Sequence, residues 1–395
     1  MRIAINCLSL DPSFVGGLNT FTRGLLGGFA KTANGHQFRV YATRKNQHLF
    51  ESLRNHRNFE VIALDDLTHA LRKYLCRAAL LSFSEKVYES ASNNIFRKIR
   101  EMMDQDADII YTPSVVLQSF DSTKPSVLSM HDIQHAHYPE FFSWPRRLSR
   151  RITYGLSARH ARFFQASSEF IKQDLLRHFE NISAEQITII PEGVSVEEFS
   201  TPADTASLCS KYVLPARFLL YPAQLWPHKN HITLLRALKQ IEVSHGLQIP
   251  LLLTGGKYSA ASEVFDYIAD QSMNYVHYHG RVPFADLVGL YQKAAFLVMP
   301  SLHESSSLLI LEAAAAGTPV FASKIPPNEE LARVFHLNLF DPSNQDELEG
   351  LLVRLWDDES AAAAQAMHNL KHITVYSWEN AAQQYLRFFE RVTEA

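Results

Sequence analysis

Short apolar runs alternate with longer segments of helical periodicity along most of the chain. The short runs are rich in β-branched and aromatic residues and predict buried strands, whereas apolar residues three and four apart predict amphipathic helices. The strands predicted first are Ile3–Leu8, Phe38–Ala42, Glu60–Leu64, Asp108–Tyr111, Val127–Met130, Phe163–Ala166 and Ile187–Ile190. After a polar stretch the series resumes with Phe218–Tyr221, Pro250–Thr254, Tyr275–His279, Ala295–Met299 and Pro319–Ala322.

This alternation is typical of parallel sheets covered by helices on both faces. Because the series restarts after residue 210, we expect an α/β protein of two doubly wound, Rossmann-like domains, 1–200 and 211–376, with a breaker-rich linker over 200–205. We expect the amphipathic C-terminal helix in 377–395 to cross back to the first domain. Ligands bind beyond the carboxyl ends of such strands, so the cleft between two facing domains is the predicted site.

Composition excludes several classes of protein. With 395 residues, of which 46% are hydrophobic and 20% charged, the chain is neither disordered nor of low complexity. Its three cysteines (Cys7, Cys76 and Cys209) lie too far apart for a disulfide framework or a cysteine zinc site. The sequence contains neither an apolar run long enough to span a membrane nor a signal peptide, and we therefore expect a cytoplasmic protein.

Charge is distributed unevenly between the two halves. Basic residues outnumber acidic ones 24 to 18 in residues 1–190, and acidic residues outnumber basic ones 23 to 14 in residues 191–395. Such asymmetry indicates domains with different partners, although chance surface composition also produces it. The basic excess includes two clusters mixed with apolar residues: Arg72, Lys73, Arg77, Lys86, Arg97, Lys98 and Arg100, and then Arg146, Arg147, Arg150, Arg151, Arg159 and Arg162.

The richest candidate chemistry lies in residues 299–313. An apolar strand ends at Pro300, a polar turn follows, and a helix is predicted to begin near Ser306. The unpaired N–H groups of a helix start favour phosphate, and Glu304 and Glu312 flank this one. Eight residues of helix place two carboxylates about 12 Å apart along the axis. This order suits a nucleotide sugar, with carboxylates on the hydroxyls at both ends and the diphosphate between them.

These glutamates have two other interpretations. The paired carboxylates of a glycosidase lie about 5–9.5 Å apart, so the expected separation disfavours a hydrolase. An N-capping serine with surface glutamates would produce the same spacing without any ligand, and this alternative stays open.

Here the sequence resembles the retaining glycosyltransferases of family 4, which have the two-domain fold called GT-B. Glu304 and Glu312, followed by residues 316–320, resemble the family signature. Further resemblances cover most of the chain: Gly16-Gly17 in the first strand-to-helix loop, His131-Asp132 after a strand, residues 166–170, residues 190–194, and residues 221–230.

The resemblance implies roles for individual residues. Lys229 would neutralise the diphosphate, His131 would orient the donor sugar, and Glu304 would hold its hydroxyls, so these three are the candidate catalytic residues. The remaining donor-binding candidates are Gly16, Gly17, Gln224, Ser305, Ser306, Ser307, Leu308 and Glu312. Gln224 stands where the family has a phosphate-binding arginine, and Ser305 and Ser307 stand where it has glycines. We expect the Gln224 amide and the serine hydroxyls to supplement the phosphate cradle.

No metal or other cofactor is expected. His131, Asp132, His135 and His137 could suggest a metal cluster, but the family is metal-independent and the chain has 18 histidines, so chance clustering explains them. The basic clusters favour contact with an anionic membrane that carries a lipid-linked acceptor, with ordinary solvated helices as the alternative. Nucleic acid is not an expected partner.

The predicted function is retaining transfer of a hexose from a nucleoside-diphosphate sugar to a saccharide or lipid-linked saccharide. The resemblance makes mannose from GDP-mannose the first choice, in surface-polysaccharide or O-antigen-type lipopolysaccharide biosynthesis at the inner face of the cell membrane. Two alternatives remain: a sugar-nucleotide epimerase or phosphorylase of the same fold, and a non-catalytic relative that binds nucleotide sugars.

Overall fold

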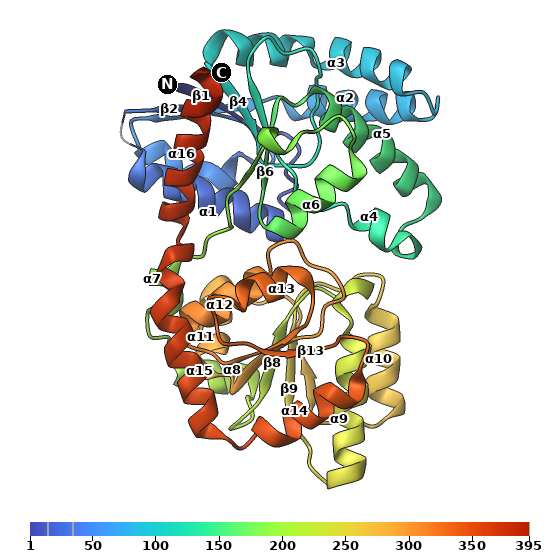
Figure 1. The fold of residues 1–395 in the computed structure, drawn as a ribbon, viewed down its shortest axis with the longest axis vertical. Coiled ribbons are helices and arrows are strands. Elements are labelled where there is room, and N and C mark those ends of the chain that lie inside the picture. The colour runs from blue at the N-terminus through green and yellow to red at the C-terminus, as the bar shows by residue number, and fades with distance from the viewer. Residues whose placement is uncertain (14–15, 34, 395) are drawn as a thin grey trace. The chain divides into compact units, whose positions relative to one another are not determined.

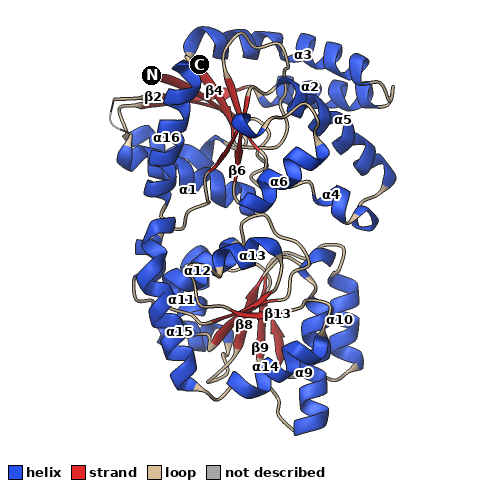
Figure 2. Cartoon of the chain, in the orientation of Figure 1, coloured by secondary structure: helices blue, strands red, loops and turns tan. Residues whose placement is uncertain are grey.

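The computed structural model describes residues 1–13, 16–33 and 35–394, which form two compact units. The first unit comprises Met1–Gly193 together with Trp378–Ala395, and the second comprises Val194–Ser377 (Figure 1). Each unit has its own parallel sheet with helices around it (Figure 2). The prediction of two doubly wound α/β domains is confirmed.

The sheet of the first unit has seven parallel strands in the order β3-β2-β1-β4-β5-β6-β7. The chain winds outward from β1 in one direction and then in the other, so the order reverses between β1 and β4. The strands are β1 (Arg2–Asn6), β2 (Gln37–Thr43), β3 (Phe59–Leu64), β4 (Ile109–Thr112), β5 (Ser126–Ser129), β6 (Phe163–Ala166) and β7 (Ile187–Ile189).

Helices of the first unit carry apolar stripes that pack onto this sheet. Its α-helices are α1 (Gly17–Thr32), α2 (Asp66–Leu80), α3 (Glu85–Asp106), α4 (Gln134–His137), α5 (Trp144–His160), α6 (Glu169–His178) and α16 (Trp378–Glu394). Short 3₁₀ helices are η1 (Gln47–Asn55), η2 (Pro139–Phe141) and η3 (Ala184–Gln186).

The sheet of the second unit has six parallel strands in the order β10-β9-β8-β11-β12-β13, which reverses between β8 and β11. They are β8 (Leu219–Pro222), β9 (Leu251–Thr254), β10 (Val276–Tyr278), β11 (Phe296–Met299), β12 (Val320–Ser323) and β13 (Asn338–Phe340). The sequence analysis missed β13, because three residues are too few to show a strand pattern.

The second unit begins with two short helices, and residues 201–204 of the predicted linker lie between them, within this unit. Its α-helices are α7 (Val196–Ser200), α8 (Thr205–Tyr212), α9 (His231–His245), α10 (Ala261–Asp270), α11 (Phe284–Lys293), α12 (Leu308–Ala316), α13 (Pro326–Leu331), α14 (Gln345–Leu355) and α15 (Glu359–His372), with η4 (Pro227–Lys229) and η5 (Ile373–Tyr376). Residues 194–200, assigned from sequence to the first domain, belong instead to the second unit, because Phe199 is part of its apolar core.

The last helix, α16, belongs to the first unit and lies along α1. Gly24 and Gly28 face Trp378 so closely that a Cβ at either position would collide with it. Further along, the Tyr385 hydroxyl lies 3.2 Å from the hydroxyl of Tyr111 on β4. Among the described residues, no helix has the length and apolarity that crossing a membrane requires.

Candidate active site

Two loops of the second unit meet where its strand order reverses. One follows β8 and runs into α9, and the other follows β11 and runs into α12. The backbone N–H of Leu302 donates to the carbonyl of His228 over 2.8 Å. Asn230, in the left-handed conformation, donates its amide to the carbonyl of Pro300 over 3.0 Å. These bonds hold the loops together at the edge of the sheet where a doubly wound fold binds its ligand.

Lys229 and Glu304, both predicted to be catalytic, form an ion pair between these loops. The Lys229 ammonium lies 2.6 Å from the Glu304 carboxylate, and both side chains are largely buried. The carbonyl of Lys229 accepts a hydrogen bond from the hydroxyl of Tyr221, which fixes the start of its side chain. The structure therefore brings the two residues to one point.

Glu304 is ionised in this arrangement. Burial opposes its charged form, but the nearby Lys229 and His228 charges and the hydrogen bond from Lys229 outweigh that effect and lower the pKa of Glu304 below its ordinary value. An anionic ligand that takes the Lys229 ammonium must therefore exchange it with a charged carboxylate. Such an exchange costs less when the ligand also offers hydroxyl donors to Glu304.

The helix start next to this pair lies two residues later than the sequence predicts. Ser307 has the left-handed backbone φ of 53°, so α12 begins at Leu308, and Ser305 and Ser306 lie in the turn before it. The axial separation of about 12 Å expected for Glu304 and Glu312 assumed continuous helix, and this assumption does not hold between residues 304 and 307. The side chain of Ser307 does not cap α12, whose first N–H groups point toward the end where ligands bind.

Ser307 does not supply a hydroxyl to the predicted cradle. Its side chain is buried and donates to the amide oxygen of Asn328 on α13, and Asn328 in turn donates to the carbonyl of Ser323. The expectation that this serine supplements the phosphate cradle was wrong. Its left-handed φ suits the glycine that the family resemblance leads us to expect at this position.

Glu312 lies in the second turn of α12 and is almost completely buried. Its carboxyl accepts a hydrogen bond of 2.7 Å from the hydroxyl of Tyr291 on α11. Burial raises the pKa of Glu312 to about 7, although the bond from Tyr291 works in the opposite direction. At neutral pH this carboxyl is thus close to half protonated.

A Glu312→Gln variant is expected to change how stability depends on pH. Since burial raises the pKa of Glu312 from 4.5 to about 7, the folded protein holds a proton that the unfolded chain releases earlier. The resulting stabilisation is complete below pH 4.5 and is lost as pH rises to 7. Between pH 4.5 and 8 the wild type should therefore lose about 3 kcal/mol of unfolding free energy relative to the variant.

Urea unfolding of both proteins across this pH range measures that difference. Glu263→Gln is the matched control, because Glu263 is exposed on α10 of the same unit. Its stability relative to the wild type should change much less over this pH range. A level difference for Glu312→Gln as well would mean that Glu312 is ionised in the folded protein.

Gln224, which replaces the family's arginine, lies in the loop after β8. Its amide oxygen accepts a hydrogen bond of 3.1 Å from the Trp226 indole, and Trp226 stacks on Tyr258 with ring centroids 4.0 Å apart. The amide nitrogen is therefore the atom turned away from Trp226. It is a neutral hydrogen-bond donor, and it lacks both the permanent charge and the two parallel N–H donors of an arginine.

In the first unit, Gly16, Gly17 and His131 gather around the start of α1. Gly16 is extended and precedes the helix, and Gly17 is its first residue. The His131 ring packs edge-on against Phe21, one turn into α1, with centroids 4.8 Å apart. Its Nδ1 lies 3.6 Å from the carboxylate of Glu192, which is buried after β7. His131 is thus held between an aromatic ring and an acid.

The other polar residues that follow His131 in sequence each contact a different partner. The carboxylate of Asp132 accepts from the backbone of Gln134, the His135 ring packs edge-on against Tyr154, and His137 bonds to buried Asp174 over 2.8 Å. Among the described residues, no three histidines, cysteines or acids are grouped as a metal ion requires.

Sequence reasoning missed several residues that organise the site. Tyr291 lies far in sequence from its partner Glu312, and no local pattern pairs them. Glu192 lies in the matching segment 190–194, but its contact with His131 is not visible in a local pattern. Asn230 was quoted only as part of a motif, although its left-handed conformation and two carbonyl contacts link the loops.

Each half of the chain matches a known protein family. Residues 15–198 match the family described as Glycosyltransferase Family 4, and residues 213–371 match Glycosyl transferases group 1. The O-antigen chain mannosyltransferase B of Escherichia coli is 26% identical over 67% of this chain and 70% of its own length. A D-inositol 3-phosphate glycosyltransferase of Corynebacterium urealyticum is 27% identical over 52% of this chain, and this match spans about half of the relative, 51%.

Solved structures share the whole fold. The Anabaena protein HepE, crystallised with UDP-glucose, superposes with a TM-score of 0.74 over 99% of this chain and 100% of its own, at 19% identity. WaaG, a glycosyltransferase of lipopolysaccharide biosynthesis, superposes with a TM-score of 0.69 at 17% identity. With family matches in both halves and two Rossmann-like sheets, this protein belongs to the family 4 glycosyltransferases of the GT-B fold.

Proposed function

We propose that this glycosyltransferase moves mannose from GDP-mannose to a saccharide acceptor, with retention of configuration at the anomeric carbon. The observation that carries the proposal is the Lys229–Glu304 pair beside the start of α12, which the Ser307 side chain does not cap. A cation and helix N–H groups suit a diphosphate, and a buried carboxylate suits the hydroxyls of a sugar. No metal is needed in this scheme, because Lys229 supplies the counter-charge.

The reaction would proceed in these steps. The acceptor hydroxyl attacks the anomeric carbon on the face that the diphosphate leaves, so the new C–O bond forms where the old one breaks. The departing phosphate oxygen takes the hydroxyl proton. Lys229 stabilises the charge that builds on the diphosphate, Glu304 holds the sugar hydroxyls, and His131 orients the sugar. Glu312 would accept hydrogen bonds from the ribose.

Support for mannose comes from similarity alone. The resemblance of residues 221–230 to mannosyltransferases and the match to the O-antigen mannosyltransferase of Escherichia coli both favour this sugar. The same relatives favour a role in O-antigen-type polysaccharide assembly. HepE was crystallised with a uridine nucleotide, so the base also has to be tested.

Thermal unfolding with GDP-, UDP-, ADP- and dTDP-sugars tests the donor, since a ligand at a hundred times its Kd stabilises a protein by about 2.7 kcal/mol. GDP-mannose should give the largest rise in Tm, and NMR of the product should show an α-mannoside. A β-linked product would contradict retention, and a larger rise with another nucleotide would contradict the proposed donor. A free isomerised sugar nucleotide, formed without acceptor, would instead identify an epimerase.

We also propose that the first unit contacts an anionic membrane, which would place the protein at the inner face of the cell membrane next to a lipid-linked acceptor. Leu81 and Phe83 in the α2–α3 turn and Trp144 at the start of α5 are all more than half exposed. The rings of Phe83 and Trp144 lie 5.7 Å apart. Exposed Arg146 and Arg147 follow Trp144 directly, and this mixture suits a surface of anionic lipid.

A Leu81→Ser/Trp144→Ser variant should bind vesicles rich in phosphatidylglycerol at least about fivefold more weakly than the wild type, because it removes apolar area that would enter the bilayer. Sedimentation with the vesicles measures the bound fraction. Val243→Ser is the control, since Val243 is equally exposed but lies on α9 of the second unit. Equal binding by all three proteins would rule out this surface.

A further inference from the structure

A cavity of about 410 Å³ lies in the first unit, between α3 and the sheet. Lys124 and Ser126 at the amino end of β5, Arg162 before β6 and Gln186 before β7 all line it. The amino ends of these strands are opposite the edge that carries His131. The lining also reaches Asn6 and Thr112 at the carboxyl ends of β1 and β4, but it includes none of the candidate site residues described above.

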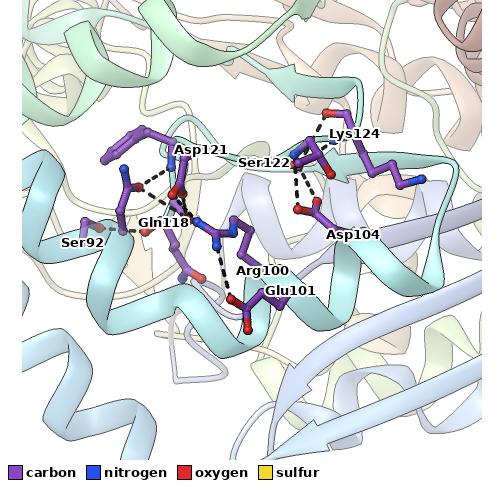
Figure 3. A network of polar contacts seen from close by, with 12 residues as sticks. Ser92, Arg100, Glu101, Asp104, Gln118, Asp121, Ser122 and Lys124 are labelled. Carbon is purple, nitrogen blue, oxygen red and sulfur yellow. Dashed lines mark hydrogen bonds and ion pairs between the residues drawn. The ribbon is translucent and has the colours of Figure 1, made fainter.

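One wall of the cavity is a strap, residues 117–124, that α3 holds in place (Figure 3). Ser92 donates to the carbonyl of Gln118 over 2.7 Å, and Arg100 pairs with Asp121. One turn further along, Asp104 accepts from Ser122 over 2.6 Å. The three attachments come from one face of the helix. The wall is thus fixed to α3 by polar contacts.

Five apolar side chains from α3 and the strap line the cavity, and together they are called its floor. Phe96, Ile99 and Met103 on the inner face of α3 line the cavity together with Leu117 and Phe120 of the strap, and all five are buried. A cavity of this size and lining accommodates a small ligand with an apolar body.

The charged side chains of the lining are all cationic. They are Arg100, Lys124, Arg159 and Arg162, and none of the described residues that line the cavity is acidic. Arg100 is neutralised by Asp121 and Arg159 by Glu85. Lys124 and Arg162 form no ion pair within the described part of the chain. Two positive charges are therefore left beside the apolar floor, which matches a head group with two negative charges.

Gln118 provides independent evidence that a hydrogen-bond donor is missing from the cavity. Its amide oxygen is buried and has no hydrogen-bond partner among the described residues, although the residue lines the cavity. A buried acceptor of this kind needs a donor from water or from a ligand.

From these observations we infer that the cavity is a second ligand site, which binds an amphiphile with a phosphate monoester head and an apolar body. The phosphate lies against Lys124 and Arg162, and the apolar body lies between α3 and the strap. The inference is independent of the proposed donor. It is also separate from the membrane surface, which involves the opposite end of α5.

Calorimetric titration of the full chain with n-octyl phosphate tests this site. Octyl phosphate should bind at one site at least about tenfold more tightly than inorganic phosphate or 1-octanol, because only it satisfies both the charges and the floor. Binding should persist with saturating GDP. Equal affinity for octyl phosphate and for either of its parts, or displacement by GDP, would overturn the inference.

A Lys124→Gln/Arg162→Gln variant locates the binding. Neither side chain is buried, so the fold should remain intact, and affinity for octyl phosphate should fall at least about tenfold. Arg57→Gln removes an exposed charge elsewhere on the first unit and should bind like the wild type. Unchanged affinity in the double variant would show that octyl phosphate binds elsewhere, and this too would overturn the inference.

Discussion

Glu304→Gln should lower kcat about 10²-fold or more while leaving the affinity for GDP unchanged or higher. The carboxylate is proposed to hold the sugar hydroxyls as the bond to the diphosphate breaks, and a neutral amide is a weaker acceptor there. In the ligand-free protein the same carboxylate occupies the Lys229 ammonium at 2.6 Å. Removing its charge therefore removes a competitor of the diphosphate.

Steady-state kinetics and calorimetry with GDP separate these two effects. Glu242→Gln is the matched control, because Glu242 pairs with Lys239 at 2.9 Å in the same unit but outside the site. It should leave kcat and GDP affinity unchanged. If Glu304→Gln retains wild-type kcat, the carboxylate does not act on the sugar.

Lys229→Met should reduce kcat/KM about 10²- to 10³-fold, because it removes the charge that stabilises the departing diphosphate. It should also cost about 3 kcal/mol of stability, since it leaves the Glu304 carboxylate buried without its partner. Kinetics with the donor and urea unfolding measure the two quantities. Lys211→Met is the control, because Lys211 pairs with Asp286 at the same distance of 2.6 Å on the exposed surface of this unit.

The double variant Lys229→Met/Glu304→Gln distinguishes catalysis from folding. Without either charge, no unpaired ion is buried, so most of the stability lost in Lys229→Met should return. Activity should not return, because the diphosphate still lacks its cation. If activity recovers together with stability, the pair serves the fold rather than the reaction.

The fold could be predicted from sequence because its strands are continuous apolar runs with little ambiguity. The run Val127–Met130 is shifted by one residue from β5, and the run Ala295–Met299 begins one residue before β11 and ends with it. The β13 strand was not predicted, because Asn338–Phe340 is too short to show a strand pattern of apolar residues. Residues 194–200 were assigned to the wrong unit because the core contacts of Phe199 cannot be seen in a local pattern.

The candidate site was only partly predictable. The motif positions indicated Lys229 and Glu304, but their direct pairing depends on two loops that lie far apart in sequence. The helix was expected to start near Ser306, because nothing in the sequence shows that Ser307 adopts a left-handed backbone. In the same way, the burial of Glu312 against Tyr291 arises from the packing of α11 on α12.

The crystal structure of the complete protein with GDP-mannose tests the central claim most directly. We predict that the diphosphate lies within hydrogen-bond distance of the Leu308 backbone N–H and of the Lys229 ammonium, with Glu304 turned from Lys229 to the hydroxyls of the sugar. A diphosphate bound elsewhere, with the contact between Lys229 and Glu304 intact, would contradict the account.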